Sequence, residues 1–309
     1  MSARPLPGHF RGGVVALGNF DGFHRGHQAV VARARELARE SARPLIVATF
    51  DPHPVRFFHP DAPPFRLTTL DQRERLFAAA GADAMLVFEF GATLAAETPE
   101  TFVADQIVAR TGATMLVTGQ DFTFGKGRAG NVAVLAALGA AHGIATEAVA
   151  AVTDAGGPIS SSRIRDALQS GDCETAARLL TRPFTIEAVV QHGDKVGREL
   201  GFPTANIALG HYLRPAYGIY AVRGRLPDGR LVDGVANIGI RPSFDPPIEL
   251  LEPYFFDFSG DLYGRTVAVE LIHYLRPERK FDDLDALKAQ IARDAADARA
   301  LLAAIPRVA

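Results

Sequence analysis

Hydrophobic and polar positions divide the chain into two parts of different character. Up to about residue 180, short apolar runs that end in glycine or proline alternate with segments rich in Ala, Leu and Arg, whose apolar positions recur at helical spacing. This alternation is typical of a parallel sheet with helical crossovers, so we predict a doubly wound α/β domain. The predicted strands span residues 13–17, 45–50, 84–88 and 114–118, and the predicted helices span 26–40, 70–80, 99–110 and 131–142, with a further helix from about Ser160.

From about residue 184 the apolar residues occur in short stretches of β character that Gly and Pro interrupt. Closely spaced strands of this kind predict a small β-barrel. Asp228-Gly229 lies between two such stretches, which is a strong hairpin signal. After Asp282, early acidic residues and apolar positions at helical spacing predict a closing amphipathic helix. We therefore predict an α/β domain over residues 1–182 and a barrel domain with a closing helix over residues 183–309.

Composition and charge mainly exclude classes of protein. The 309 residues are 48% hydrophobic, which is enough to fill a core in each of two domains. The formal net charge of −2 provides no overall attraction to nucleic acid or to an anionic membrane, so neither is an expected partner. The single cysteine, Cys173, excludes an intrachain disulfide and a multi-cysteine zinc site, and we expect its thiol to be inert or at the surface. Without a signal-peptide pattern or a long apolar run, the expected location is the cytoplasm.

A candidate phosphate site follows the first predicted strand, where the chain reads VVALGNFDGFHRGHQAVV. Its glycines let the backbone approach a ligand, and a helix that begins near Gly26 directs unpaired amides and the positive end of its dipole at an anion. His24 and His27 are three residues apart, so both can donate hydrogen bonds to charge that develops on transferring phosphate groups. The alternative, that these residues only shape and cap a turn, is less favoured for such a dense cluster. The candidate phosphate-binding residues are Gly18, Phe20, Asp21, Gly22 and Gly26.

This motif, GNFDGFHRGH, resembles the HxGH motif of nucleotidylyltransferases, in the form found in bifunctional bacterial riboflavin kinase/FAD synthetases. It is neither a dinucleotide fingerprint nor a Walker loop. The segments FDPHPVRFF, GQDFTFGKGRAGN and ISSSRIR resemble further motifs of that family, in the family's order. The resemblance implies catalytic roles for His24, His27, Ser161, Ser162 and Arg165, with Arg163 or Arg165 as the cation on the leaving pyrophosphate. It also implies flavin contacts from Asp51, His53, Asp121 and Phe122, the last of which can equally be a core residue.

The barrel part contains a second candidate site, HGDKVGRELGFPTANI, which resembles the riboflavin kinase motif GxxxGRxLGFPTAN. Glycines around cationic residues suit a flap over ATP phosphates, whereas such a loop taken alone is more often a solvated turn. Thr204 and Asn206 offer oxygen atoms of the kind that Mg²⁺ prefers, and residues two apart on a strand share one face. The resemblance assigns phosphate binding to Gly193, Lys195, Gly197 and Arg198, and magnesium binding to Thr204 and Asn206.

A kinase also needs a base that orients the attacking hydroxyl. The family has a glutamate in the strand ahead of DFxGDLYG, which here makes Glu252 the matching residue, with Glu249 as a competitor. Pro253 lacks an amide donor and therefore predicts an edge or bulged strand. The motif GVANIGIRPSF implies that Asn237 and the Arg241-Pro242 turn lie near the substrates. Arg276, Arg279 and Phe281, near the closing helix, are candidate flavin contacts or surface residues.

The resemblance covers residues 12–300 and implies two reactions that use ATP and Mg²⁺. The barrel would phosphorylate riboflavin to FMN, and the α/β domain would adenylylate FMN to FAD with release of pyrophosphate. Two alternatives stay open: an adenylyltransferase for another phosphorylated metabolite with a non-catalytic flavin-binding barrel, and a flavin-sensing or storage protein without turnover. An RNA ligase is disfavoured because no basic face is evident. The sequence does not predict an oligomeric state.

Overall fold

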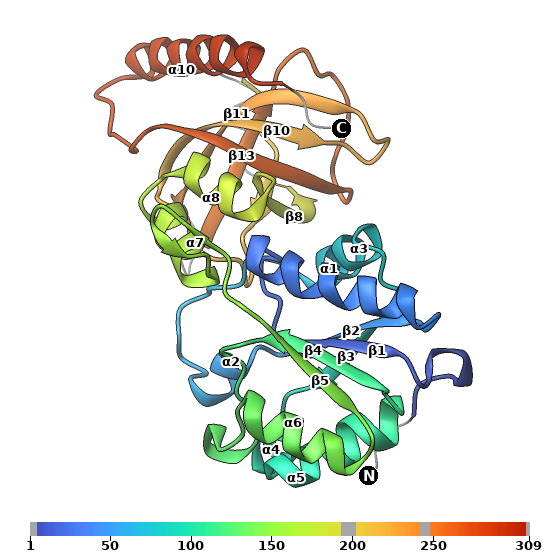
Figure 1. Cartoon of the computed structure of the whole chain (residues 1–309). Coiled ribbons are helices and arrows are strands. Elements are labelled where there is room, and N and C mark those ends of the chain that lie inside the picture. The colour runs from blue at the N-terminus through green and yellow to red at the C-terminus, as the bar shows by residue number, and fades with distance from the viewer. Residues whose placement is uncertain (1–4, 193–201, 242–247, 307–309) are drawn as a thin grey trace. The chain divides into compact units, whose positions relative to one another are not determined.

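The computed structural model describes residues 5–192, 202–241 and 248–306 of the chain (Figure 1). The chain folds into two compact units. Unit 1 comprises Met1–Pro63 and Thr68–Ser160, and unit 2 comprises Pro64–Leu67 and Ser161–Ala309. The predicted fold, an α/β part followed by a barrel with a closing helix, is confirmed.

Unit 1 is built on a five-stranded sheet with the order β3-β2-β1-β4-β5, and all its strand pairs are parallel. The order reverses at β1, and in open α/β sheets such a switch point, at the carboxyl ends of the strands, is where ligands bind. Four of the strands lie where the apolar runs predict them, and β5 adds a fifth. The strands are β1 (Val14–Leu17), β2 (Leu45–Asp51), β3 (Ala84–Glu89), β4 (Met115–Gly119) and β5 (Ala145–Val149).

Helices cover both faces of this sheet (Figure 1). In β1, Val14 and Ala16 join the core under α1 and α3, whereas Val15 and Leu17 join the core under α4, η2 and α6. This alternation follows from the two-residue period of a strand. The predicted helix over 99–110 is mostly a π-helix, η2. The elements are α1 (Arg25–Glu40), α2 (Pro54–Phe58), α3 (Leu70–Ala79), α4 (Ala92–Ala96), α5 (Pro99–Thr101), η2 (Phe102–Ala109) and α6 (Val132–Ala141), with the short elements η1 (Gly8–Phe10), η3 (Lys126–Arg128), β6 (Thr153–Asp154) and β7 (Gly157–Pro158).

Unit 2 contains a closed antiparallel barrel with the strand order β10-β11-β12-β9-β8-β13. The predicted hairpin joins β10 to β11, where the amide of Leu226 donates to the carbonyl of Arg230. Helix α10 packs on the outside of the barrel, and Ala295, Ala298 and Leu302 of α10 are buried there (Figure 1). The elements are β8 (Phe184–Gln191), β9 (Asn206–Ala208), β10 (Gly218–Arg225), β11 (Leu231–Arg241), β12 (Ile248–Phe255), β13 (Thr266–Arg276) and α10 (Leu284–Ala304).

The prediction that Pro253 marks an edge or bulged strand is wrong, because β12 pairs with β11 on one side and with β9 on the other. The carbonyl of Pro253 accepts from the amide of Ala205, just ahead of the first residue of β9. Since the N and C=O of one strand residue point to the same side, the missing N–H of Pro253 faces Ala205, a position just before β9 begins. The ladder with β11 therefore loses no hydrogen bond.

Two helices that follow β7 along the chain and precede the first barrel strand belong to unit 2. They are α7 (Ser161–Gln169), which begins where the serine run predicts it, and α8 (Cys173–Leu180), which packs on β13 and β8. The compact units thus divide after Ser160, whereas the functional boundary between residues 182 and 183 stays a prediction.

A short segment of the α2–α3 connection, Pro64–Leu67, also belongs to unit 2. The amide of Arg66 donates to the carbonyl of His211 at 3.3 Å, and its carbonyl accepts from the amide of Leu213 at 2.8 Å. The Nε of Arg165 in α7 donates to the carbonyl of Phe65 at 2.8 Å. Along the sequence, the chain therefore enters unit 2 at Pro64, returns to unit 1 at Thr68 and enters unit 2 again at Ser161.

An ion pair between Arg276 and Asp294 links the end of β13 to α10. The Nε and Nη2 of Arg276 lie 2.9 and 2.6 Å from the two carboxylate oxygens of Asp294, whose side chain is only 6% exposed. Breaking a buried pair leaves an uncompensated charge, so we expect Asp294→Asn to lower the free energy of unfolding of unit 2 by about 3 kcal/mol. All six tyrosines lie in unit 2 and the chain has no tryptophan, so tyrosine fluorescence during urea unfolding measures this unit. The exposed Asp297 on the same helix gives the control, Asp297→Asn, and an equal effect of the two variants would contradict the assignment.

Cys173 is buried at the start of α8. Burial and the charges of the adjacent Glu174 and Asp172 raise the pKa of its thiol to about 12. Because the thiolate is the reactive form, we expect the native chain at pH 8 to react with a thiol reagent about 1000-fold more slowly than an unperturbed cysteine. Its rate should rise with pH towards 12, and unfolded chain should take up one equivalent. Fast labelling of native chain at pH 8 would show that the thiol is accessible.

Candidate active sites

The first site is the turn that joins β1 to α1, residues 18–27, which we call the His turn. Three of its residues have left-handed backbone: Phe20, Gly22 and Phe23, with φ of 51°, 85° and 42°. Such conformations are unfavourable for phenylalanine and persist only where packing determines them. Both phenylalanine rings are buried and meet the ring of Phe77 edge-on, at centroid distances of 5.7 and 5.1 Å. The core beneath α3 therefore holds the His turn in its strained form.

His24 caps the N-terminus of α1 with its imidazole. Its buried Nδ1 accepts from the amides of Gly26 and His27, at 3.2 and 3.4 Å. A neutral imidazole that accepts through Nδ1 carries its proton on Nε2, which makes Nε2 a hydrogen-bond donor. The prediction that α1 directs unpaired amides at an anion is wrong for these two amides, because the His24 ring already occupies them.

The structure brings the two predicted histidines together. The rings of His24 and His27 stack with centroids 3.6 Å apart and an interplanar angle of 17°. Gly26 makes room for this arrangement, since a Cβ there would lie 3.1 Å from the His24 ring and 3.4 Å from the carbonyl of Ile159. Gly18 is needed for a similar reason, because a Cβ there would lie 3.1 Å from the Phe20 ring. Stacked imidazoles at a helix N-terminus can donate to neighbouring oxygens of one polyphosphate.

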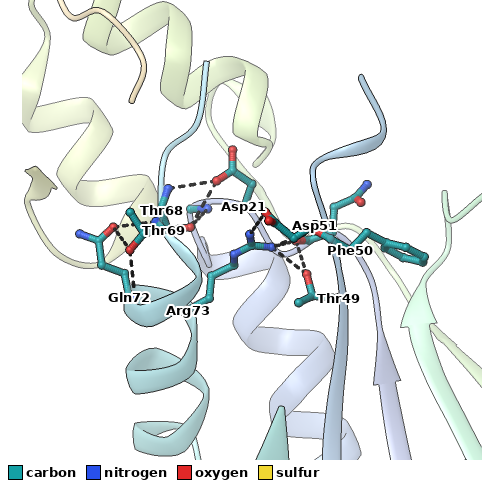
Figure 2. A network of polar contacts seen from close by, with 10 residues as sticks. Asp21, Thr49, Phe50, Asp51, Thr68, Thr69, Gln72 and Arg73 are labelled. Carbon is teal, nitrogen blue, oxygen red and sulfur yellow. Dashed lines mark hydrogen bonds and ion pairs between the residues drawn. The ribbon is translucent and has the colours of Figure 1, made fainter. Parts of the chain in front are cut away.

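Asp21, predicted to bind phosphate, is buried and fastens the His turn to the chain ahead of α3 (Figure 2). Its Oδ1 accepts from the amide of Thr68 at 3.0 Å, and Thr68 Oγ1 accepts from the amide of Gly22 at 2.9 Å. The next residue, Thr69, forms a capping box with Gln72 at the start of α3. Both sets of contacts make the His turn and the start of α3 one connected structure.

Asp51, predicted to contact flavin, ends β2 and pairs with Arg73 of α3 (Figure 2). The Arg73 side chain is only 4% exposed, and its Nη2 lies 3.2 Å from Asp51 Oδ1. Sequence reasoning missed Arg73, although one signal was present. With Leu70 and Phe77 it occupies spacing i, i+3, i+7 on α3, so an arginine stands at an apolar position of the helix.

His53 caps the short helix α2, where its Nδ1 accepts from the amide of Val55 at 3.2 Å. Beside it lies an aromatic cluster formed by Phe57, Phe58 and Phe90, with ring centroids 5.2–5.8 Å apart. Phe58 is 58% exposed, so part of this cluster faces solvent. The rings meet edge-on, and the cluster offers an aromatic surface near the carboxyl ends of β2 and β3.

The remaining predicted residues of the first site lie in two places. Asp121 is exposed just after β4, while Phe122 is half-buried, stacks on Phe124 at 5.8 Å and packs on the core. The serine–arginine motif lies in α7 of unit 2, and its role beside the His turn stays a prediction. Its predicted residues are Ser161, Ser162, Arg163 and Arg165.

The second site lies on the barrel. Thr204 stands just ahead of β9, and Asn206 is the first residue of β9. Glu252 pairs directly with Asn237 of β11, and extending the β12–β9 register by one step sets Glu252 opposite Asn206. Residues opposite each other on neighbouring strands share a face, so Asn206, Glu252 and Asn237 form one row across three strands. The predicted flap residues Gly193, Lys195, Gly197 and Arg198, and Pro242, lie outside the described residues.

The two candidate bases face opposite sides of β12, because they are three residues apart on a strand of period two. Glu249 accepts from Arg214 Nε at 2.6 Å and from the hydroxyl of Tyr217. Burial disfavours its charged form, but these hydrogen bonds outweigh burial and lower the pKa of Glu249. Glu249 is thus an ionised partner in a structural network, away from the Asn206–Asn237 row.

Glu252 has different neighbours. Its side chain is 14% exposed and contacts the guanidinium of Arg241, whose pKa is lowered by burial. Asn237 Nδ2 donates to Glu278 at 3.0 Å, while its buried Oδ1 has no hydrogen-bond partner among the described residues. A buried unsatisfied oxygen is costly, so this position favours a further hydrogen-bond donor. Arg279, a predicted flavin contact, is exposed and lies over the ring of Phe281 at 4.8 Å.

Known families match both parts of the chain. The model described as FAD synthetase matches residues 7–163, and the model described as riboflavin kinase matches residues 180–302. Three proteins named bifunctional riboflavin kinase/FMN adenylyltransferase are similar along nearly the whole chain. The Escherichia coli (strain K12) protein is 40% identical over 93% of this chain and 92% of its own. The Pseudomonas fluorescens protein is 42% identical over 95% and 94%, and the Bacillus subtilis (strain 168) protein is 38% identical over 92% and 91%.

A solved structure titled a macrolide-efflux protein from Streptococcus pneumoniae has the same fold. It is 32% identical, covers 94% of each chain and gives a TM-score of 0.84. In the part of this chain that the structure describes, none of the helices has the length and apolar character needed to span a bilayer.

Proposed function

Because this chain belongs to the family of bifunctional riboflavin kinase/FMN adenylyltransferases, we propose that it makes FMN from riboflavin and FAD from FMN, with ATP as the second substrate of both reactions. The observation that carries the proposal is the presence of two separate constellations in one chain. These are the stacked His24–His27 pair at the sheet's switch point and the Asn206–Glu252–Asn237 row on the barrel. Use of ATP by both sites favours the cytoplasm as their compartment.

In adenylyl transfer, a phosphate oxygen of FMN attacks the α-phosphorus of ATP and pyrophosphate leaves, so no covalent enzyme intermediate is needed. His24 donates from Nε2, since its Nδ1 is held by the amides of α1. His27, stacked on it, donates to a neighbouring oxygen. These donors stabilise the charge that develops in the transition state. Arg163 or Arg165 provides the cation for the leaving pyrophosphate. The phosphate-binding backbone of the His turn is shaped by Gly18, Phe20, Gly22 and Gly26. Asp21 holds this backbone in place through its hydrogen bond with Thr68.

The flavin half of this site lies at the carboxyl end of β2. Phe57, Phe58 and Phe90 offer the aromatic surface for the flavin ring, and Asp51 and His53 lie beside it. Asp121 and Phe122, after β4, complete the proposed contacts.

In the kinase reaction, Glu252 accepts the proton of the riboflavin 5′-hydroxyl as that oxygen attacks the γ-phosphorus of ATP, and ADP leaves. The hydroxyl of Thr204, the amide oxygen of Asn206 and the Glu252 carboxylate form a set of hard oxygen donors that fits Mg²⁺, and Thr204 and Asn206 would hold it. The ion would neutralise charge on the ATP phosphates. Lys195 and Arg198, with Gly193 and Gly197 around them, would cover these phosphates, and Asn237 and Arg279 would contact flavin.

The test separates the two reactions. Purified chain is incubated with ATP and Mg²⁺ and either riboflavin or FMN, and flavins are resolved by chromatography while pyrophosphate is measured. We expect FMN and then FAD from riboflavin, FAD and an equal amount of pyrophosphate from FMN, and neither product with EDTA. FAD formation from FMN without any FMN formation from riboflavin would instead support an adenylyltransferase with a passive barrel. Tight flavin binding without turnover would support a flavin-sensing or storage protein.

A further inference from the structure

We propose that Arg73 is a positioning residue for adenylyl transfer. It joins the start of the His turn to the end of β2 and so fixes the nucleotide half of the site relative to the flavin half. The inference rests on the proposed adenylyltransferase function and assigns a role to a residue that no sequence motif picked out.

Stability alone does not explain a buried cation at position 73. The Arg73 side chain is 4% exposed on a helix face that otherwise contributes apolar residues to the core, among them the buried Phe77. Burying an ion pair has a desolvation penalty that often cancels its attraction, and apolar replacements of similar volume are frequently as stable. An arginine at such a position therefore points to a requirement for its directed donors.

The donors of Arg73 connect the segment after β1 with the end of β2 (Figure 2). The ladder between β1 and β2 ends at Leu17 and Ala48, followed by one further bond from the amide of Gly18 to the carbonyl of Ala48. Beyond it, Arg73 Nη1 donates to the carbonyl of Asn19 at 3.2 Å and to Thr49 Oγ1 at 2.9 Å.

Thr49 completes this connection, because its hydroxyl donates to the same Asn19 carbonyl at 2.7 Å. The other nitrogen, Nη2, reaches Asp51 at 3.2 Å. One planar guanidinium thus takes the place of the missing ladder between Asn19, the second residue of the His turn, and Asp51, which ends β2.

Arg73 also neutralises a negative charge in the site, that of Asp51. Asp51 is 23% exposed and lies in the flavin half of the site, where FMN with its phosphate group is proposed to bind. A phosphate monoester carries a charge of about −1.5 to −2 at pH 7, so an unpaired carboxylate there would repel it. The pairing with Arg73 removes that repulsion. The geometric role and the charge role then predict separable kinetic effects, the first on kcat and the second on the KM for FMN.

The experiment compares Arg73→Met and Arg73→Lys in the full chain. Methionine removes both roles, whereas lysine keeps a charge beside Asp51 but cannot form the planar fork that also reaches Asn19. For Arg73→Met we expect kcat of FAD formation to fall about 100-fold, the loss that a misplacement of about 1 Å produces. We also expect its KM for FMN to rise about tenfold, as for the loss of one charge-assisted interaction. Arg73→Lys should restore the KM for FMN and leave kcat at least about tenfold low.

Two controls test whether the effect is confined to unit 1 and whether it differs from a general weakening of α3. Riboflavin phosphorylation by the same variant chains should stay at the wild-type rate, because Glu252, Thr204 and Asn206 lie in unit 2. Thr69→Ala removes the cap of α3 without touching Asn19 or Asp51, so it weakens the same helix and should leave the KM for FMN unchanged.

The inference is overturned if Arg73→Met makes FAD with wild-type kcat and KM, or if Thr69→Ala reproduces its kinetic profile, which would show that α3 only needs to be folded. If lysine and methionine raise the KM for FMN equally, the charge role fails. Should the wild-type chain make no FAD, the proposed function fails instead, which the unmodified control distinguishes.

Discussion

Replacing His27 with alanine is expected to lower the rate of FAD formation about 100- to 1000-fold, the usual loss when one donor to developing negative charge is removed. His27 is the better test than His24, because the His24 ring also caps α1 and its loss would weaken the helix. The part of His27 that supports the cap is its backbone amide, which alanine keeps. The variant should therefore lose most of its adenylyl-transfer activity and keep its fold.

The same reaction mixture provides the internal comparison. With riboflavin, ATP and Mg²⁺, the His27→Ala chain should accumulate FMN at the wild-type rate, because the proposed kinase residues lie in unit 2. His142→Ala, at an exposed position after α6, is the matched control and should leave both rates unchanged. Loss of both reactions by His27→Ala, with an unchanged melting temperature, would show that the two reactions are not divided between the units as proposed.

Replacing Glu252 with glutamine is expected to lower riboflavin phosphorylation about 100- to 10,000-fold, the range that a positioned general base contributes. Glutamine keeps the shape of the side chain and removes its capacity to accept a proton. Formation of FAD from added FMN should continue at the wild-type rate in this variant.

Glu249→Gln is the matched control for that experiment, since it makes the same substitution three residues away on the opposite face of β12. It weakens the contacts with Arg214 and Tyr217 and should lower stability more than the rate of phosphorylation. If Glu249→Gln abolished phosphorylation and Glu252→Gln did not, the base would have to be reassigned to Glu249. The Asn206–Glu252–Asn237 row would then no longer be the proposed kinase site.

The elements that the sequence predicts well are those whose pattern is local. Strands β1 to β4 are nearly continuous apolar runs because both sheet faces are covered, and the predicted hairpin depends on two adjacent turn residues. Strand β5 reads ATEAV and was missed, because it is an edge strand whose residues are only partly buried and include a Thr and a Glu. The π-helix η2 has no pattern of its own, since its apolar spacing fits an α-helix equally well.

For the candidate sites too, the sequence predicts the features that lie within one local segment and not those that depend on packing. His24 and His27 belong to one turn, so their spacing predicts that their rings can meet, and the structure places them in a stack. Arg73 reaches Asn19 and Asp51 only because α3 packs beside β1 and β2, and no local pattern contains that information. For Glu252 and Glu249, strand parity indicates that they face opposite sides. Only the pairing with β11 and β9 identifies which side holds the asparagines.

The return of Pro64–Leu67 to unit 2 means that this chain is not a simple head-to-tail fusion of two modules. Cleavage after Ser160 would yield an N-terminal fragment that still carries Arg66, separated from its backbone partners His211 and Leu213. The complementary fragment would lack those four residues. Exchanging one half for that of a relative would therefore also require transplanting the matching α2–α3 connection.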